Sequence, residues 1–340
     1  MKKLLSLAFI LATSFLFAQS ENDKKIFLDS LNKETTEANH VYYRIIKDYN
    51  LNRDSYLVNT HYKSGKIKTE SVIADKSAPY KTTGTTTEFY ENGKKRSEFN
   101  PSTDKNDFST RNSWFENGNL ESEIKTNEKT RIGTENYYYE DGTIQSIWEF
   151  DYSNYNNKRN RKMIQFWDKN KRQLVKDGNG IYLLENKRSR IKGVVKDYYK
   201  DGDWVEEYFE TNTVITERYD NGNFILGKRK ENDGTQIEYT EIEKQPSPKN
   251  GIKDFMSHIQ KTFKASNEAV KNKVNGKIFI EFVIEKDGKI SDVKLVRGLG
   301  YGLDEEAIRV ISNYENWIPG QQKGKNVRVR YSVPIMISLK

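Results

Sequence analysis

A short turn motif recurs along the middle of this chain and limits what the chain can fold into. Each copy has one or two aromatic residues, a charged or polar residue and, in most copies, Asn or Asp followed by Gly. Asn-Gly and Asp-Gly between β-rich segments are the strongest short-range signal for a β-hairpin. Repetition at a nearly constant spacing predicts a row of hairpins rather than one closed globular core. The seven copies end at Gly65, Gly93, Gly118, Gly142, Asn170, Gly202 and Gly222.

The expected turns contain two residues, and such a turn fixes which residues face each other across the hairpin. The residue three positions before each Gly is then predicted to lie opposite the residue two positions after it. Five of the resulting pairs are apolar on both sides, which favours one buried sheet face. These pairs are Tyr62 with Ile67, Phe115 with Leu120, Tyr139 with Ile144, Tyr199 with Trp204, and Tyr219 with Phe224.

A second aromatic row precedes the first by one residue and is therefore predicted to lie on the opposite sheet face. Polar residues follow it across the turns, so this face is expected to be solvated. We interpret the row as a candidate contact surface for a partner. The alternative is that neighbouring repeats or the N-terminal segment cover it. The residues are Phe89, Trp114, Tyr138, Phe166 and Tyr198.

The repeat region resembles the MORN-like repeats of the YwqK type, which occur in toxin–antitoxin-associated proteins. The resemblance spans about Tyr42 to Tyr239, and we assign residues 42–244 to the repeats. In one copy Asn170 stands where the pattern has Gly. The resemblance implies an elongated β-meander that binds or scaffolds partners.

The first residues are typical of a secretory signal peptide. Lys2 and Lys3 precede an apolar run from Leu4 to Ala18, and a polar sequence follows. As a helix the run would span roughly 22 Å, against about 30 Å of membrane hydrocarbon. We therefore assign residues 1–19 to a cleaved signal peptide and 20–41 to an N-terminal segment. An uncleaved membrane anchor is the alternative.

Composition excludes several classes of protein. The chain has no cysteine, so disulfide scaffolds and cysteine-based zinc sites or nucleophiles are absent. Basic and acidic residues alternate despite a net charge of +8, which does not favour nucleic-acid binding. The His residues lie in separate segments without ligand spacing, and the loop from Gly298 to Gly302 lacks dinucleotide-binding spacing. We expect no enzyme, catalytic residue, metal, cofactor or small-molecule substrate.

The C-terminal part has a different pattern. Residues 245–251 have the composition of a linker, and 252–340 are predicted to form a separate α+β domain. Strands are expected at 277–285 and 290–297, joined by an Asp287-Gly288 turn that pairs Phe279 with Val296, Ile280 with Leu295 and Phe282 with Val293. A helix follows from Leu303, and a last strand at 327–337 alternates cleanly between apolar and polar residues.

These segments resemble the C-terminal domain of TonB, the energy transducer of Gram-negative cell envelopes. Five stretches match in order, and a further match lies in the lead-in helix around Phe255. The resemblance implies a three-stranded antiparallel sheet with helices on one face, and a domain that grips an extended segment of an outer-membrane receptor. The matching stretches are residues 276–284, 287–288, 302–307, 317–320 and 327–335.

Strand addition is the physical basis of such a grip, because an open sheet edge offers unpaired N–H and C=O groups to an extended peptide. We predict that the last strand supplies this edge, since Pro334 is typical of an edge strand. The two arginines are expected either to meet acidic receptor groups or to lie in solvent. The predicted partner-binding residues are Val327, Arg328, Val329, Arg330, Tyr331, Val333 and Ile335.

The favoured function is an exported TonB-family protein of the periplasm or cell envelope, which binds an outer-membrane receptor in energy-dependent transport. The departures from TonB itself are the short apolar run without His and the replacement of a Pro-rich spacer by repeats. One alternative is a scaffold or immunity-type protein that uses the repeats for partner binding. Another is an enzyme that presents the aromatic face to a glycan.

Overall fold

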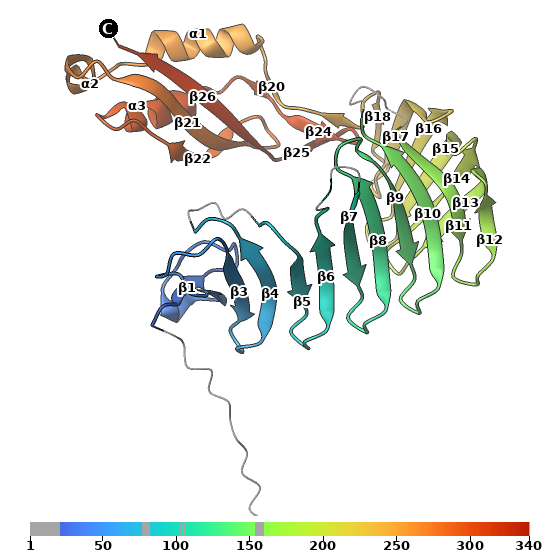
Figure 1. Ribbon diagram of the computed structural model, residues 1–340. Helices are drawn as coiled ribbons and strands as arrows, with labels where there is room; N and C mark the ends of the chain where they lie inside the picture. Colours follow the sequence, from blue (N-terminus) through green and yellow to red (C-terminus); the bar gives the residue numbers. More distant parts are fainter. Residues whose placement is uncertain (1–20, 77–81, 103, 105–106, 154–159, 340) are drawn as a thin grey trace, which may run out of the picture. The chain divides into compact units, whose positions relative to one another are not determined.

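The computed structural model describes residues 21–76, 82–102, 104, 107–153 and 160–339 (Figure 1). The expected signal peptide, residues 1–19, lies outside the described residues. The chain is mainly β, as predicted: a long antiparallel meander of 18 strands precedes a small C-terminal α+β domain. None of the helices in the described part has the length and apolar character that crossing a membrane requires.

The chain divides into two compact units, one up to Gln173 and one from Leu174 onward. The strands of the meander are mostly four to ten residues long and rich in aromatic and β-branched residues, which favour a pleated, half-buried surface. The first unit contains β1 (Lys24–Leu28), β2 (Tyr42–Ile46), β3 (Tyr56–Tyr62), β4 (Ile67–Ile73), β5 (Thr86–Phe89), β6 (Lys95–Asn100), β7 (Phe108–Trp114), β8 (Leu120–Asn127), β9 (Ile132–Tyr138), β10 (Ile144–Asp151) and β11 (Arg161–Trp167).

The second unit begins within β12 and continues the meander. Its repeat strands are β12 (Gln173–Lys176), β13 (Asn179–Glu185), β14 (Ser189–Lys196), β15 (Tyr199–Tyr208), β16 (Thr213–Asp220), β17 (Asn223–Lys230) and β18 (Gln236–Tyr239). From β13 to β18 each strand pairs antiparallel with the next one in the sequence. The pairing within this part of the meander is thus between sequence neighbours, as expected of stacked hairpins.

The turns of the first unit contain one residue more than predicted. In the first copy the N–H of Tyr62 donates to the carbonyl of Lys66, and the N–H of Gly65 donates back to the carbonyl of Tyr62. Gly65 has a φ of 90°, whereas Ser64 before it does not have a positive φ. The loop is therefore a type I turn followed by a Gly bulge. The same two hydrogen bonds recur at Tyr90, Phe115 and Tyr139.

This extra residue makes the predicted cross-strand pairs of these copies wrong by one position. Trp114, rather than Phe115, lies opposite Leu120, and Tyr138, rather than Tyr139, lies opposite Ile144. His61 likewise takes the place predicted for Tyr62 opposite Ile67. The physical reason is that a Gly bulge needs a positive φ only at Gly, so the preceding Asn or Asp keeps ordinary backbone angles.

Two-residue turns do occur in the second unit. Asn221 and Gly222 both have positive φ, and Tyr219 pairs with Phe224, which confirms that prediction. The predicted turn at Gly202 is wrong, because Tyr199 and Trp204 lie in one continuous strand, β15. The turn in that copy lies at Asp197 and Tyr198, both with positive φ.

Short strands and helices form the C-terminal domain. Its three-stranded antiparallel sheet has the order β22 (Ile290–Arg297), β21 (Asn275–Ile284), β26 (Val329–Ser338). The helices are α1 (Ile252–Thr262), α2 (Asn267–Lys271) and α3 (Leu303–Ser312). The remaining short strands are β19 (Glu243–Lys244), β20 (Ser247–Pro248), β23 (Trp317–Ile318), β24 (Gly320–Gln322) and β25 (Lys325–Val327).

The predicted pairs between β21 and β22 are partly correct. Ile280 lies opposite Leu295, as the expected turn predicts, but Phe279 lies opposite Arg297 rather than Val296. A second register shift follows Glu281, so Phe282 is not paired with Val293. Both differences arise from bulges in β22, which the alternating sequence pattern does not reveal.

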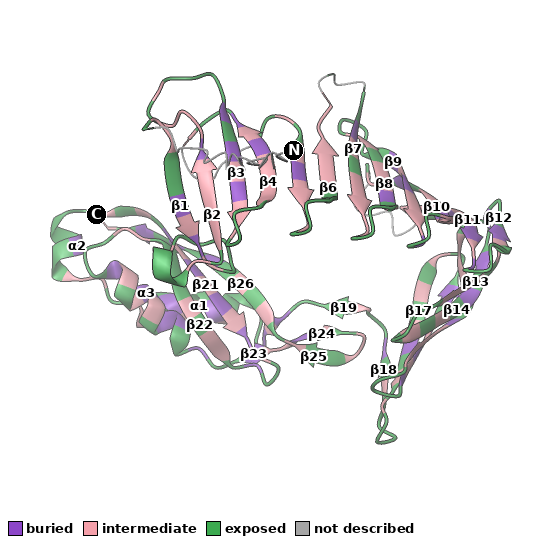
Figure 2. Cartoon of the chain, turned by 90° about the horizontal axis from the view of Figure 1, so that it is seen from below, coloured by how far each residue is buried: buried purple, intermediate pink, exposed green. Residues whose placement is uncertain are grey.

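The core of this domain lies between the sheet and its helices, where buried residues concentrate in Figure 2. Trp317 is 1% exposed and its ring packs against Phe255 of α1, Phe282 of β21 and Tyr331 of β26. The apolar stripe of α3 faces the same core, with Leu303 and Ala307 fully buried. One continuous core therefore joins all the layers of the domain and fixes the position of β26.

The segment expected to be a linker is ordered. Ser247 and Pro248 form β20 and pair with Ile318 and Trp317 of β23. Gly251, with a φ of 82°, then caps the start of α1. The segment thus pairs with β23 and leads directly into α1.

Candidate functional site: the open edge of the C-terminal sheet

The last long strand, β26, is an edge strand. In the described part of the chain its sheet has the order β22–β21–β26, so β26 pairs on one side only. Ten consecutive residue pairs join it to β21, from Asn275 with Ser338 to Ile284 with Val329, without any shift of register. A regular strand of this length offers about 33 Å of backbone to an added strand.

The predicted strand at 327–337 is divided in two in the structure. Val327 ends β25, which pairs with β24, and Val329 begins β26. Arg328 lies between them and connects the β19–β24–β25 sheet to the β22–β21–β26 sheet. The candidate edge therefore consists of Val329 to Ser338 and no longer includes Val327 or Arg328.

The opposite edge of the same sheet is less regular. Strand β22 has two register shifts against β21, and Asp292 within it has a φ of 51°. Bulges twist a strand and interrupt its row of free backbone groups, which is a common protection against edge pairing. Of the two edges, β26 thus offers the longer uninterrupted row.

The side chains of β26 alternate between the two faces of the sheet. Val333, Ile335 and Ile337 are buried against the helices, at 3–6% exposure. Tyr331 is half-buried, and its ring packs at a tilt against that of Trp317, with the centroids 5.1 Å apart. The residues between them point to the open face and are exposed: Arg330, Ser332, Pro334, Met336 and Ser338. The predicted contact residues Val333 and Ile335 therefore belong to the core, where they fix the strand in place.

Pro334 indicates which backbone groups point away from β21. It lies opposite Phe279, and because proline has no N–H it occurs in edge strands with its nitrogen on the open side. Alternate residues of a strand direct their backbone groups to the same edge. The groups of Arg330, Ser332 and Met336 are thus available to an added strand, with one N–H missing at Pro334.

The two arginines near the start of β26 are bound within the domain. The guanidinium of Arg328 lies 2.7 and 2.8 Å from the carboxylate oxygens of Glu285, and 3.6 Å from Asp292. These hydrogen bonds from Arg328 hold the pKa of Glu285 below its ordinary value. Arg330 lies 3.4 Å from Glu281 across the open face and remains 70% exposed. Neither arginine is therefore an unpaired charge, and only Arg330 lies beside the open edge.

The second aromatic row of the repeats does not form one surface. Phe166 is fully buried, so its predicted role as a contact residue is wrong. Tyr198 lies in a turn rather than on a strand face, because the hairpin there is shifted by four residues. Phe89, Trp114 and Tyr138 are half-buried at the ends of β5, β7 and β9, and the ammonium of Lys95 lies over the ring of Trp114. The row thus provides three half-buried rings at strand ends and one exposed ring in a turn, Tyr198, which is 37% exposed.

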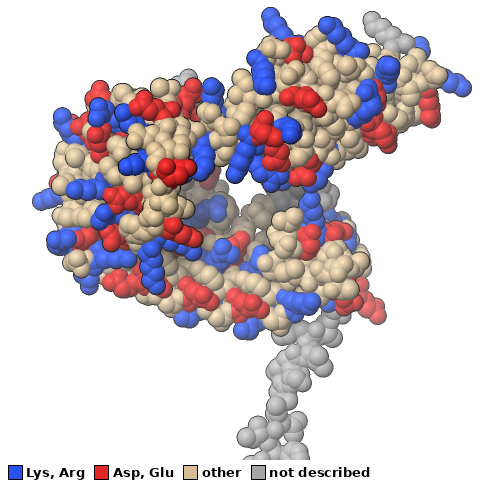
Figure 3. Space-filling model, turned by 180° about the vertical axis from the view of Figure 1, so that it is seen from behind, with Lys and Arg blue, Asp and Glu red and all other residues tan. Residues whose placement is uncertain are grey.

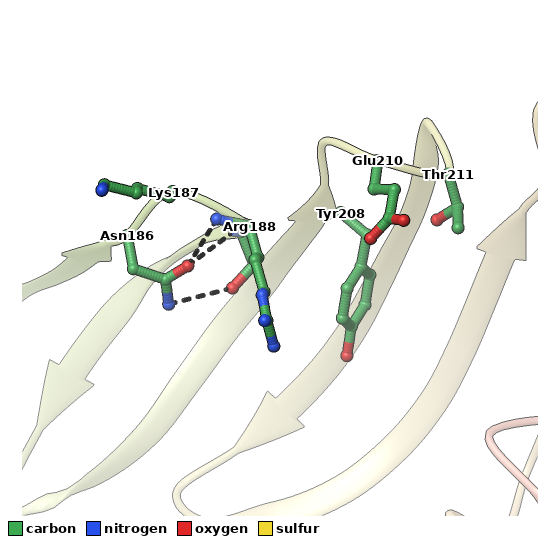
Figure 4. A pocket seen from close by; sticks show the side chains of 7 residues that line it. Asn186, Lys187, Arg188, Tyr208, Glu210 and Thr211 are labelled. Atoms are coloured by element: carbon green, nitrogen blue, oxygen red, sulfur yellow. Dashed lines mark hydrogen bonds between the residues drawn. The ribbon is translucent and has the colours of Figure 1, made fainter.

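A hollow of about 520 Å³ lies between two turns of the repeat sheet (Figure 4). Asn186 orders one turn by accepting hydrogen bonds from the backbone N–H groups of Arg188 and Ser189. The ring of Tyr208, at the end of β15, and the side chain of Glu210, in the turn after it, line the other side. Charges of both signs line this hollow, and they are also interspersed on the face drawn in Figure 3. The lining combines Lys187 and Arg188 with Glu210 and therefore does not identify one class of ligand.

Comparison with known proteins bears on the C-terminal domain. Residues 266–339 match the family model of the Gram-negative bacterial TonB protein C-terminal, as the sequence motifs predicted. This family consists of interaction domains that serve energy transduction in the Gram-negative envelope. No curated protein matches the chain.

Proposed function

We propose that the domain matching the TonB C-terminal family binds an extended segment of an outer-membrane receptor, which is added as a fourth strand beside β26. The chain would then act in energy-dependent transport across the outer membrane, as an exported protein of the periplasm or cell envelope. The observation that carries the proposal is the open edge of β26, ten residues long and free of bulges.

Main-chain hydrogen bonds would supply most of the affinity in this mode of binding, while alternate side chains supply specificity. On the open face, the added strand would lie beside Met336, which is 66% exposed, and beside Arg330. An apolar residue next to Met336 and an acidic residue next to Arg330 would fit these neighbours. The missing donor at Pro334 would leave two short ladders of hydrogen bonds instead of one continuous ladder.

The test is the capture of receptors from detergent-solubilised outer membranes by the mature full-length chain, with and without Ser332→Pro. This substitution removes an outward N–H and should leave the pairing with β21 intact. We expect about tenfold less captured receptor, because a lost backbone hydrogen bond and the added ring both oppose strand pairing. Hydrogen exchange on the captured complex should show that receptor binding slows exchange in β26.

Ser332→Ala is the matched control, since it changes the same side chain but keeps the N–H. It should capture receptors as the native chain does. Capture by Ser332→Pro at the native level, or equal losses in both variants, would exclude strand addition at this edge. Sequencing of the mature N-terminus tests export separately, and a start near residue 20 is expected.

A second candidate function is a scaffold in which the repeats bind a partner protein. One observation favours it: Ile181 and Val194 lie directly opposite each other on β13 and β14, and they are 50% and 46% exposed. Exposed apolar pairs on a sheet face are typical of contact surfaces when they belong to a larger patch. Loss of partner capture in Ile181→Ser together with Val194→Ser, with receptor capture unchanged, would support this function.

A further inference from the structure

The tip of the β24–β25 hairpin reaches the repeat strands β15–β18 of the same compact unit (Figure 1). Lys323 is at this tip, and its ammonium lies 2.7 Å from a carboxylate oxygen of Glu206 and 3.8 Å from one of Glu217. The Lys323 side chain is only 27% exposed, and that of Glu206 only 19%. This ion pair is therefore partly withdrawn from water and joins residues 117 positions apart in the chain.

The repeat surface that contacts Lys323 carries a second carboxylate, Glu217, held in a fixed position. It is 6% exposed and accepts hydrogen bonds of 2.8 and 2.9 Å from the hydroxyls of Tyr219 and Tyr239. The ammonium of Lys200 lies over the rings of Trp204 and Tyr219, at 4.5 and 4.7 Å. Lys200 is one cation that interacts electrostatically with two carboxylates, Glu217 and Glu206. Lys323 supplies the positive charge for the second carboxylate. Without it, a mostly buried carboxylate would lack a partner, which would destabilise the fold.

The backbone of the hairpin tip is fixed as well as its side chains. The N–H of Lys323 donates a 2.7 Å hydrogen bond to the carbonyl of Ile242. Gly324 has a φ of 76°, and a Cβ at this position would lie 2.7 Å from Ile237 and 3.2 Å from Tyr239. A side chain larger than glycine therefore does not fit between the tip and β18.

A second ion pair lies on the other side of the tip. The ammonium of Lys325 is 2.9 Å from Glu231, which also accepts hydrogen bonds from Arg229 and Thr213, both at 2.8 Å. These hydrogen bonds lower the pKa of Glu231 to about 2. Burial opposes the charged form of Glu206, but the hydrogen bonds from Lys323 and Tyr208 outweigh it and lower the pKa of that carboxyl. Glu206 and Glu231 therefore stay charged to a lower pH than an ordinary glutamate, and each can pair with its lysine.

We propose that the tip of the β24–β25 hairpin, through Lys323, binds strands β15–β18 in one fixed position. This contact, called the joint below, attaches the C-terminal domain to the repeat sheet. Strand β25 continues into β26 with only Arg328 between them, and β24 pairs with β19. A partner held at β26 would then be linked to the repeats through an ordered joint rather than a free tether. The joint does not depend on strand addition, so it can exist in a chain that binds no receptor.

Hydrogen exchange of the full-length chain tests the joint. In Lys323→Met, the amide of Lys323 and the segments 236–244 and 320–327 should exchange about tenfold faster or more, the effect expected for losing a charge-assisted hydrogen bond. Exchange in β21 and β26 should not change. Lys289→Met is the matched control, because Lys289 forms an exposed ion pair with Asp287 in the other hairpin of the domain.

Two further variants cover the case in which Lys323→Met disturbs folding. Glu206→Gln removes the partner carboxylate and should open the same two segments, whereas Lys323→Arg keeps the charge and should protect them. The proposal is overturned if these segments exchange freely in the native chain. It is equally overturned if Glu206→Gln, or a folded Lys323→Met, behaves like Lys289→Met.

Discussion

The hydroxyl of Tyr139 donates a 2.8 Å hydrogen bond to the backbone carbonyl of Trp167, which lies 28 residues further along the chain. Tyr62 makes the same bond to the carbonyl of Phe89, and Tyr90 to that of Trp114, both at 2.7 Å. The last aromatic residue before each of these turns thus ties its hairpin to the next one. This bond gives a physical reason for the period of the sequence repeat.

Replacing Tyr139 by Phe should lower the free energy of unfolding by about 1 kcal/mol, because the carbonyl of Trp167 loses its partner while the ring packing stays. Urea unfolding should show a lower midpoint with an unchanged slope. Tyr301→Phe is a suitable control, since Tyr301 is 44% exposed. Equal midpoints for the two variants would contradict a stabilising role of the bond.

The repeats show how far the sequence predicts the fold. The motif of an aromatic residue before Asn-Gly or Asp-Gly correctly located the turns that end at Gly93, Gly118 and Gly142. It did not reveal the register, because Asn-Gly fits both a two-residue turn and a type I turn with a Gly bulge. The choice depends on the next repeat: Asn117 and Asn119 both donate to the carbonyl of Glu140, a contact between turns that a local pattern does not contain.

Gly193 is predicted to tolerate no side chain. The indole ring of Trp204 covers it, and a Cβ at this position would lie 2.2 Å from the ring. Trp204 is 4% exposed and donates from its Nε1 to the carbonyl of Val194, so it has little freedom to move. Gly193→Ala should therefore cost about 1–3 kcal/mol, typical of overpacking. Gly84→Ala, where the nearest atom would be 3.9 Å away, should leave the urea midpoint nearly unchanged.

Glu231 should make the stability of the chain depend on acid pH. Its folded-state pKa of about 2 lies below the ordinary 4.5, since Arg229, Lys325 and Thr213 donate to it. A lowered pKa adds stability above about pH 4.5, and this stability is lost as the pH falls toward 2. Unfolding in urea at several pH values should show a smaller acid loss in Glu231→Gln, by on the order of 1 kcal/mol. Parallel pH profiles would contradict the assignment.

The sequence predicted the elements of the C-terminal domain better than its connections. Alternation of apolar residues located the last strand, and Pro334 indicated an edge. The break at Arg328 was not predicted, because the apolar alternation continues through Val327 and Val329. The joint at Lys323 was not predictable either, since its partners Glu206 and Glu217 come from another part of the chain and resemble ordinary surface charges in the sequence.

Pro334→Val tests the direction of the open backbone groups on β26. The N–H of Leu339 donates to the carbonyl of Val274, so the even-numbered residues of β26, including residue 334, direct their nitrogens outward, and the variant gains an N–H on the open edge. The free energy of unfolding should then change by less than about 1 kcal/mol, mainly through greater freedom of the unfolded chain. Self-association should increase, because an uninterrupted edge pairs more readily with a second copy.

An inward-facing nitrogen, which would contradict this orientation, would give a different result for the same variant. An inward N–H would donate to the carbonyl of Phe279, which lies opposite residue 334, and would stabilise the chain by about 1 kcal/mol without promoting self-association. Urea unfolding and sedimentation equilibrium, measured on the same samples, therefore distinguish the two orientations. Met336→Val is the control, because it changes an exposed side chain of β26 but no backbone donor. A stabilised monomer would mean that the outward backbone N–H and C=O groups belong to the neighbours of Arg330, Ser332 and Met336. The receptor segment would then have to pair with β26 in a register shifted by one residue.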